Sequence, residues 1–228
     1  MDMKKLIIIG FCLISAGCAT HGSDNDMDAT GQPYAKGNPE ELYKMGGQYA
    51  KGNGGVQQNY DKAVQYYRGA AVQGYAKAQY ALGYMYRTGH GVPRDYNLSA
   101  KWFERAAEQG NSDAEYSLGV RYLLGQGTGQ DDGQAMTWFK KAADQGNPYA
   151  ENQIGFMYAS GKSVTQDYPT AMQWYQRAAD HGLASAQYNL GLMYQNGVGT
   201  PVDKVKAQQL FSEARARGFS PGQKTEEE

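Results

Sequence analysis

Small, apolar and aromatic residues recur along this chain of 228 residues with a period of 36 positions. The same spacing separates residues of several types, which chance does not produce and which indicates an internal repeat. Each series occupies one slot of the repeat unit. The series are Gly74, Gly110, Gly146, Gly182 and Gly218; Gly83, Gly119, Gly155 and Gly191; Tyr86, Tyr122, Tyr158 and Tyr194; Ala78, Ala114, Ala150 and Ala186; and Trp102, Trp138 and Trp174.

One repeat unit, residues 75–110, contains two helical patterns. In the first pattern, Ala78, Leu82 and Met85 fall at helical spacing and form one apolar face. Gly83 lies within this pattern. A glycine inside a helix costs about 1 kcal/mol of helix stability, so its recurrence predicts that a second helix approaches closely there.

The second pattern begins after a Gly-His-Gly turn at residues 89–91, where glycine permits the left-handed backbone that ends a helix. Trp102 and Phe103 lie in this pattern, and we expect them to pack in a core rather than to bind a ligand. An aspartate stands where each second helix needs an N-cap, which favours capping over metal binding. These aspartates are Asp95, Asp131, Asp167 and Asp203.

One helix pair of this size cannot bury its apolar face alone, whereas stacked pairs share a continuous core. The pattern therefore predicts an all-α fold, a right-handed αα-hairpin solenoid of about five 36-residue units over residues 38–218. Asn38 is expected to cap the first helix, with Pro39 at its first position. Residues 219–228 are predicted to form a polar tail.

These units resemble the Sel-one-like repeat (SLR) family, a relative of the tetratricopeptide repeats. The family pattern Ala-x-x-x-Leu-Gly-x-x-Tyr-x-x-Gly-x-Gly-Val stands here as AQYALGYMYRTGHGV at residues 78–92, followed by Asp95 and by SAKWFERAAEQG at residues 99–110. The resemblance covers residues 38–218 and implies protein–protein interaction and scaffolding, as in bacterial adaptors and exported, host-contacting proteins. A cysteine-rich branch, linked to penicillin binding and β-lactam hydrolysis, staples its units with cysteine pairs. The absence of cysteine after Cys18 weighs against membership of that branch.

The first residues of the chain resemble a bacterial lipoprotein signal. Two lysines precede an apolar stretch at residues 6–14 that is too short to span a bilayer, and small residues lead to Cys18. The pattern predicts a signal peptide at residues 1–17 and lipidation of Cys18. An ordinary signal peptide cleaved nearby, or a buried apolar helix, is the alternative. Residues 18–37 have no helical period and are predicted to form a flexible tether.

The residue after Cys18 is Ala19 rather than an aspartate. By resemblance to enterobacterial sorting rules, this favours the outer membrane, with the protein facing the periplasm. A lipid chain would anchor the protein to the membrane without making it span.

Charge and motif content limit the possible chemistry. Lys and Arg number 22 and Asp and Glu number 23, for a net charge of −1, so the basic footprint of a nucleic-acid-binding domain is missing and no nucleic-acid partner is expected. Both cysteines precede the repeats, which excludes a disulfide or a Cys-ligated metal within the solenoid. The glycine-rich segment 125–133 lacks the Lys-Ser/Thr ending of a phosphate loop and is expected to be an interhelix turn. We therefore expect no catalytic residues, no metal and no cofactor.

By analogy with other solenoids, the first helix of each pair is expected to line a concave face where a protein partner binds. Aromatic side chains together with arginine are typical anchors for such partners. Packing between units is the alternative role for the same residues. The residues predicted to bind a protein partner are Tyr80, Tyr84, Arg87, Tyr116, Leu123, Tyr149, Phe156 and Tyr188.

The sequence favours a non-enzymatic protein-binding scaffold, anchored by lipid in the cell envelope and facing the periplasm. A narrower alternative is an immunity protein that neutralises a secreted antibacterial effector, for example a phospholipase. The third alternative is an enzyme acting on cell-wall or β-lactam substrates, which would need a nucleophile beside a base. The sequence sets neither the identity of the partner nor the oligomeric state.

Overall fold

The computed structural model describes residues 34–221, and every regular element in that range is an α-helix. The predicted signal peptide, Cys18 and most of the predicted tether lie outside the described residues, as do residues 222–228 of the predicted tail. The helices are α1 (Pro39–Lys51), α2 (Tyr60–Ala71), α3 (Ala76–Thr88), α4 (Tyr96–Ala107), α5 (Ser112–Leu124), α6 (Asp132–Asp144), α7 (Pro148–Ser160), α8 (Tyr168–Asp180), α9 (Ala184–Asn196) and α10 (Lys204–Ala216).

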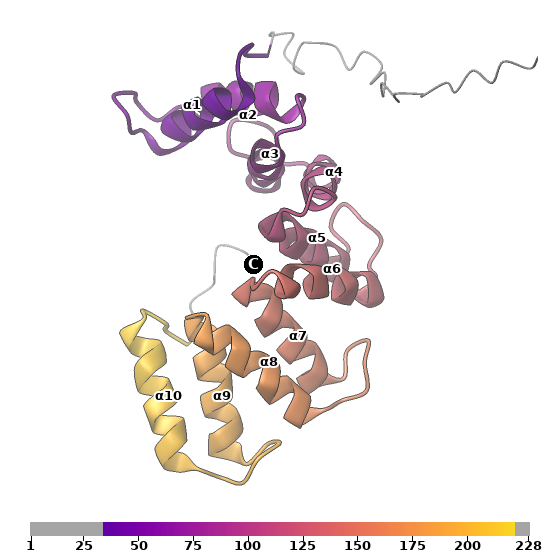
Figure 1. Cartoon of the computed structure of the whole chain (residues 1–228), viewed down its shortest axis with the longest axis vertical. Helices are drawn as coiled ribbons and strands as arrows, with labels where there is room; N and C mark the ends of the chain where they lie inside the picture. Colours follow the sequence, from indigo (N-terminus) through magenta and orange to yellow (C-terminus); the bar gives the residue numbers. More distant parts are fainter. Residues whose placement is uncertain (1–33, 222–228) are drawn as a thin grey trace, which may run out of the picture. The chain divides into compact units, whose positions relative to one another are not determined.

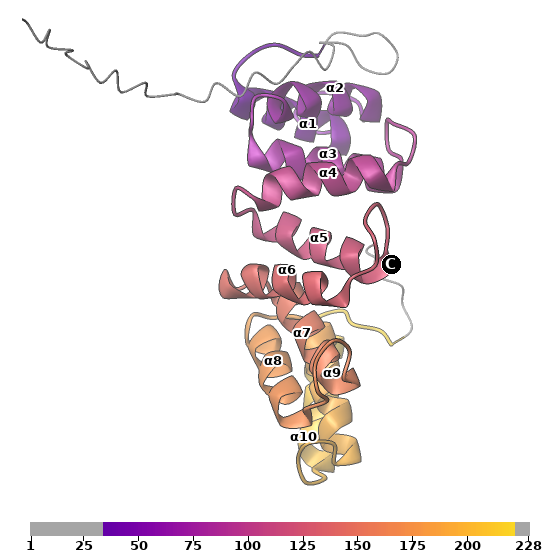
Figure 2. The ribbon, with the colours of Figure 1, turned by 90° about the vertical axis from the view of Figure 1, so that its right-hand side faces the viewer.

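The helices pair as hairpins in chain order, from α1 with α2 to α9 with α10. Each hairpin also contacts the next, because the second helix of one packs against the first helix of the following one. Figures 1 and 2 show the hairpins following one another from the indigo pair to the yellow pair. The prediction of an all-α solenoid built from helix pairs is confirmed.

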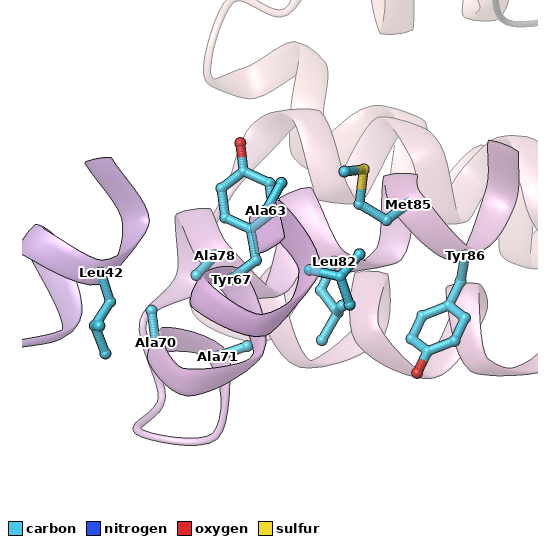
Figure 3. Close-up of a cluster of buried hydrophobic side chains, with 10 residues drawn as sticks. Leu42, Ala63, Tyr67, Ala70, Ala71, Ala78, Leu82, Met85 and Tyr86 are labelled. Carbon is cyan, nitrogen blue, oxygen red and sulfur yellow. The ribbon is translucent and has the colours of Figure 1, made fainter. Parts of the chain in front are cut away.

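The apolar core continues from one hairpin into the next. Figure 3 shows the first part of it, where Leu42 of α1, Tyr67 of α2 and Leu82 of α3 belong to one cluster of buried side chains. Another cluster joins α5, α6 and α7 in the same way. Separating two neighbouring hairpins would therefore expose apolar surface on both, which is the physical reason that one hairpin is not stable alone.

Within each hairpin, a glycine of the first helix faces an aromatic ring of the second. A Cβ atom added to Gly83 would lie 2.7 Å from Cδ1 of Phe103, which is closer than non-bonded carbon atoms approach. Phe103 has no exposed surface. The prediction of a close helix approach at Gly83 is thus confirmed, and it holds for every hairpin. The pairs are Gly46 with Tyr67, Gly83 with Phe103, Gly119 with Phe139, Gly155 with Tyr175, and Gly191 with Phe211.

Two of these aromatic residues are tyrosines. Burial raises the pKa of Tyr67 to about 12, with a smaller contribution from Tyr43, and burial raises the pKa of Tyr175 to about 12. Both hydroxyl groups therefore stay neutral at physiological pH, so a tyrosine in this slot adds no charge to the core.

The tryptophans of the second helices are partly buried and pack against the same core. Trp102 borders the cluster of the first hairpins, and the guanidinium carbon of Arg105 stands 4.5 Å from the centre of its ring. In the next unit, Nζ of Lys141 stands 3.8 Å from the centre of the Trp138 ring. The predicted packing role of these aromatic residues is confirmed, and a cation covers the outer face of the ring in each case.

Side-chain oxygens at the helix starts satisfy backbone N–H groups that have no partner within the helix. Asp95 accepts hydrogen bonds from the backbone N–H groups of Asn97 and Leu98 at 2.8 and 3.0 Å. Asn38 caps α1 and Pro39 is its first residue, as predicted. The same capping role, and not a shared metal site, is confirmed for the remaining aspartates of the series. They are Asp131, Asp167 and Asp203.

In three of the units a turn glycine contacts the unit before it. Gly91 has a positive φ of 70°, and a Cβ atom there would collide with the carbonyl oxygen of Tyr60. Two further turns repeat this contact, Gly127 against Tyr96 and Gly199 against Tyr168. The fourth unit has Ser163 in this slot, at a φ of 63°, and Asp132 in the tyrosine slot. There the carboxylate of Asp132 lies 3.3 Å from Nζ of Lys162, so an ion pair links the two units.

A buried polar residue on the first helix of each of the last four hairpins contacts the end of the second helix. Glu115 is 4 % exposed and accepts a hydrogen bond from Nε2 of Gln145 at 2.7 Å. Glu151 has no exposed surface; it accepts a hydrogen bond from Nε of Arg177 at 3.1 Å and lies 2.8 Å from Nδ1 of His181. The other two pairs are Gln79 with Gln109 and Gln187 with Glu213. These contacts satisfy polar groups that would otherwise be buried without a partner.

The glycine–aromatic contact predicts opposite effects of alanine at two adjacent positions. Gly46→Ala should lower the free energy of unfolding by about 1–3 kcal/mol, since its methyl group would overlap the Tyr67 ring. Gly47→Ala should raise it by up to about 1 kcal/mol, because alanine favours the helix and its methyl group would stand 3.7 Å from the Tyr67 hydroxyl. Chemical denaturation followed by circular dichroism measures both. Equal effects of the two substitutions would show that the ring contact does not set the spacing.

The buried carboxyl of Glu115 predicts a pH-dependent stability. Burial raises the pKa of Glu115, an effect only partly offset by Gln145 and Lys141. Because this carboxyl has a higher pKa in the folded state than in the unfolded chain, the folded protein loses stability as pH rises from the usual pKa of 4.5 toward neutrality. Glu115→Gln should therefore raise the melting temperature at neutral pH, and the gain should shrink on acidification. The equivalent residue of the second unit is Gln79, so a glutamine is compatible with this position. A matched Glu104→Gln substitution at an exposed position of α4 should show no such trend, and a lower melting temperature of Glu115→Gln at neutral pH would contradict the prediction.

Candidate functional site

A groove of about 640 Å³ runs along the first helices of successive hairpins. Its lining comes from α3, α5, α7, the start of α9 and the segment that follows α10. The α5 and α7 helices meet in it through Tyr116 and Tyr149, whose ring centres are 5.7 Å apart. Next to it, Nδ2 of Asn189 on α9 donates a hydrogen bond to Oδ1 of Asn152 on α7 at 3.0 Å. Side chains of α7 are therefore in direct contact with those of α5 and of α9.

Five of the residues predicted to bind a partner line this groove together. Tyr80 and Tyr84 come from α3 and are half-buried, and the guanidinium carbon of Arg87 stands 4.8 Å from the centre of the Tyr84 ring. Tyr116 is largely buried, whereas Tyr149 is 47 % exposed. The groove lining thus contains Tyr80, Tyr84, Arg87, Tyr116 and Tyr149.

The structure places the other three predicted residues elsewhere. Leu123 is partly buried against the core that joins α5, α6 and α7. Tyr188 packs between two rings, with centres 5.2 Å from Phe211 and 5.0 Å from Phe219. Phe156 is 47 % exposed but does not line the groove. Helical spacing gives the angle of a side chain on its helix and not which segment of the chain lies beside it, so it could not show that these three residues lie outside the groove.

Several lining residues were missed by reasoning from the sequence, among them Arg217 and Phe219. Phe219 follows the last helix, within the segment predicted as a polar tail, and packs against Tyr188. The period of 36 contained the signal, because Phe219 stands in the slot of Tyr75 and Leu183. The other lining residues outside the predicted set are Ser117, Val120, Arg121, Asn152, Gln153, Leu183, Ala184, Ser185 and Gly218.

Arg121 departs from the repeat pattern. It occupies a slot that holds a buried methionine in three of the other four units, and it is only 3 % exposed. Nη1 of Arg121 donates a hydrogen bond to Oε1 of Gln126, and its guanidinium carbon stands 5.7 Å from the centre of the Tyr96 ring. The methionines are Met85, Met157 and Met193, and the first unit has Gln48 in this slot. A buried charge thus borders the groove at α5.

The two histidines of the described chain lie outside the groove and contact other side chains. The His90 ring stacks on Tyr60, with ring centres 4.5 Å apart, and His181 contacts the buried Glu151. Among residues 34–221 no group of three or more His, Cys, Asp or Glu side chains could hold a metal ion. The groove can accordingly bind through aromatic surface, amide and hydroxyl groups and positive charge.

Across the described part of the chain, no helix has both the length and the apolar character that a membrane crossing requires. The residue predicted to carry the lipid, Cys18, lies outside that part.

A model of the Sel1 repeat matches five consecutive segments, residues 42–75, 76–111, 112–147, 148–183 and 184–219. Among solved structures, the chain is similar to a protective antigen of uropathogenic Escherichia coli strains that displays an SLR fold, at 39% identity and a TM-score of 0.73; the match covers 79% of this chain and 38% of the antigen. It is similar to a Sel1 repeat protein from Oxalobacter formigenes at 37% identity and a TM-score of 0.76, covering 80% and 74% of the two chains.

An immunity protein from Pseudomonas aeruginosa shares the fold at 22% identity and a TM-score of 0.56, over 82% of this chain and 68% of that one. The comparison with curated proteins gives no match.

The positions of Tyr188 and Phe156 predict different costs of truncation. Tyr188→Ala should lower the melting temperature, because it removes a ring held between Phe211 and Phe219, a loss of about 2–4 kcal/mol. Phe156→Ala should leave the melting temperature almost unchanged, since nearly half of its surface is already exposed. Thermal denaturation of the two variants provides the measurement. A large loss for Phe156→Ala would assign that side chain to packing between units.

Proposed function

Because the chain belongs to the Sel1 repeat family, whose members are protein-interaction scaffolds, we propose that it is a non-enzymatic scaffold held in the bacterial cell envelope. In this proposal a lipid on Cys18 anchors the chain to the outer membrane, and the solenoid faces the periplasm and binds a protein partner along its groove. Five matched repeats establish the family and the scaffold class. The anchor, the location and the partner are the proposed part.

The binding role is supported by the residue composition of the groove. Four tyrosines from three successive first helices share it with Phe219, and aromatic side chains of this kind are enriched where proteins anchor their partners. Tyr149 leaves almost half of its surface exposed there. Neutral polar groups such as Asn152 and Gln153 stand between the rings and can pair with a peptide backbone.

A non-enzymatic role is supported by where the reactive side chains stand. The aspartates that open the second helices are bound to backbone N–H groups. His90 and His181 are engaged in packing and with Glu151. A catalytic nucleophile needs a base within hydrogen-bond reach, and the groove lining offers tyrosine, serine and arginine without histidine, cysteine or carboxylate.

The envelope location is supported by the first 18 residues. A short apolar stretch followed by small residues and Cys18 is typical of a lipoprotein signal. The properties of the Escherichia coli antigen are not carried over as a whole, since the match spans only 38% of its length.

An immunity protein is the second candidate. One structural neighbour, from Pseudomonas aeruginosa, is an immunity protein, and a tethered binding surface suits the neutralisation of an effector at the membrane. Since that likeness is at 22% identity and is one of fold, the candidate depends on the identity of the partner.

Site-specific photocrosslinking in living cells tests the binding role. A benzophenone amino acid in place of Tyr149 should crosslink to an envelope protein, because this ring lines the groove and is 47 % exposed. The same probe in place of Tyr168, a 37 % exposed tyrosine at the start of α8 and outside the groove, is the matched control. A crosslinked product from position 168 alone would show that the partner binds another face of the solenoid. If the crosslinked protein is an antibacterial effector, the immunity candidate is favoured.

Metabolic labelling tests the anchor. Cys18→Ala should abolish incorporation of labelled palmitate and release the protein from the outer-membrane fraction, because the thiol of Cys18 would carry the lipid. Unchanged labelling would place the lipid elsewhere, and unchanged fractionation without labelling would show another means of membrane attachment.

A further inference from the structure

We propose that the groove binds an acidic segment of the partner protein, a stretch in which Asp or Glu residues flank an apolar or aromatic residue. The inference deepens the proposed function and rests on it, since it names the chemistry that the scaffold would recognise.

Among residues 34–221, all the charged side chains that line the groove are arginines. They are Arg87, Arg121 and Arg217, and this described lining includes no aspartate, glutamate or lysine. The chain as a whole has 22 basic and 23 acidic residues, so the positive charge of the groove does not reflect a basic composition. A concave surface with one sign of charge attracts a ligand of the opposite sign. Arginine also matches a carboxylate with a planar pair of N–H donors, which lysine does not offer.

The arginines are spread along the groove. Arg87 belongs to α3, the first helix in the lining, and its guanidinium is stacked over Tyr84 at 4.8 Å. Arg217 follows α10 at the other end, is exposed, and donates a hydrogen bond from Nη1 to the carbonyl oxygen of Gly182 at 3.3 Å. Because that acceptor is uncharged, the positive charge of Arg217 is not cancelled there. Carboxylates near both ends of a bound segment would face these two side chains.

Between the two ends the lining is aromatic and apolar. Tyr116 and Tyr149 form a tilted ring pair, and Val120 lies one turn beyond Tyr116 on α5. Such a surface favours an apolar or aromatic side chain at the centre of the segment. Four first helices side by side span three helix spacings of about 10 Å, or the length of roughly nine extended residues.

Asp113 lies at the start of α5, one turn before Ser117, and is not part of the groove lining. Its Oδ1 accepts a hydrogen bond from Nδ2 of Asn147 at 3.2 Å. This contact holds the carboxylate between the start of α5 and the start of α7.

Selection from a displayed library of random peptides of roughly nine residues, against the full-length chain in detergent, tests the proposal. The enriched peptides should carry net negative charge together with an aromatic or aliphatic residue. One of them, resynthesised with Asn and Gln in place of its Asp and Glu, should bind about tenfold more weakly because the paired charges are lost. The Arg87→Gln, Arg217→Gln double variant should lose affinity for the acidic peptide by about the same factor.

The matched control removes two positive charges outside the groove. Arg94→Gln with Lys101→Gln, both at exposed positions, should leave the affinity unchanged, and all variants should melt at the wild-type temperature. Enrichment of neutral or basic peptides, no enrichment, or an equal loss in the control would overturn the proposal. So would binding of phosphatidylglycerol vesicles through the same two arginines without peptide enrichment, which would assign the groove to lipid.

Different results would reject the acidic segment and the proposed envelope scaffold. Crosslinking from position 149 to an envelope protein, together with selection of non-acidic peptides, would leave the scaffold standing and reject the acidic segment. Absence of any crosslink from the groove, with acidic peptides still enriched in vitro, would instead reject the proposed location of the partner in the envelope.

Discussion

The contact between a helix glycine and an aromatic ring is the constraint on which the rest of the structure depends. In every hairpin the ring of the second helix lies where a Cβ atom of the first helix would otherwise be. This fixes how closely the two helices approach and therefore where the outer faces of the hairpin stand. Since a hairpin also shares its core with the next one, a change in that distance would be transmitted along the stack. The ring itself can be phenylalanine or tyrosine, because Tyr67 and Tyr175 stay neutral when buried.

The groove is lined by the first helices of successive units, whose core slots hold similar residues. Some of the differences between units lie on this face. Tyr116 and Tyr149 contact each other across two units, and Arg121 stands where three of the other units have a buried methionine. Each departure is compatible with the fold, since the glycine–aromatic contact beside it is unchanged. Specific chemistry is thus added to a regular framework without altering it.

Much of the candidate site followed from the repeat period and helical spacing. Tyr80 and Tyr84 lie in the groove because the side chains of a first helix that face neither its partner helix nor the core must face outward. The same reasoning failed for Tyr188, whose outward face is covered by Phe219. Phe219 belongs to no helix of the structure, and only its slot in the period of 36 connects it with Leu183. Spacing within a helix cannot show what the chain does after the helix has ended.

The sequence by itself determined the class of fold, the number of units and the sites of close approach. These are local or periodic properties: a glycine every 36 residues, an aspartate before each second helix and a continuous apolar stripe. Only the tertiary structure decided which side chains share the groove and that the charged residues in its described lining are arginines. Arg87 and Arg217 are separated by more than three repeat units in the chain. They line one surface because the stacking of hairpins converts a separation in sequence into proximity in space, and stacking depends on packing between units that no single unit encodes.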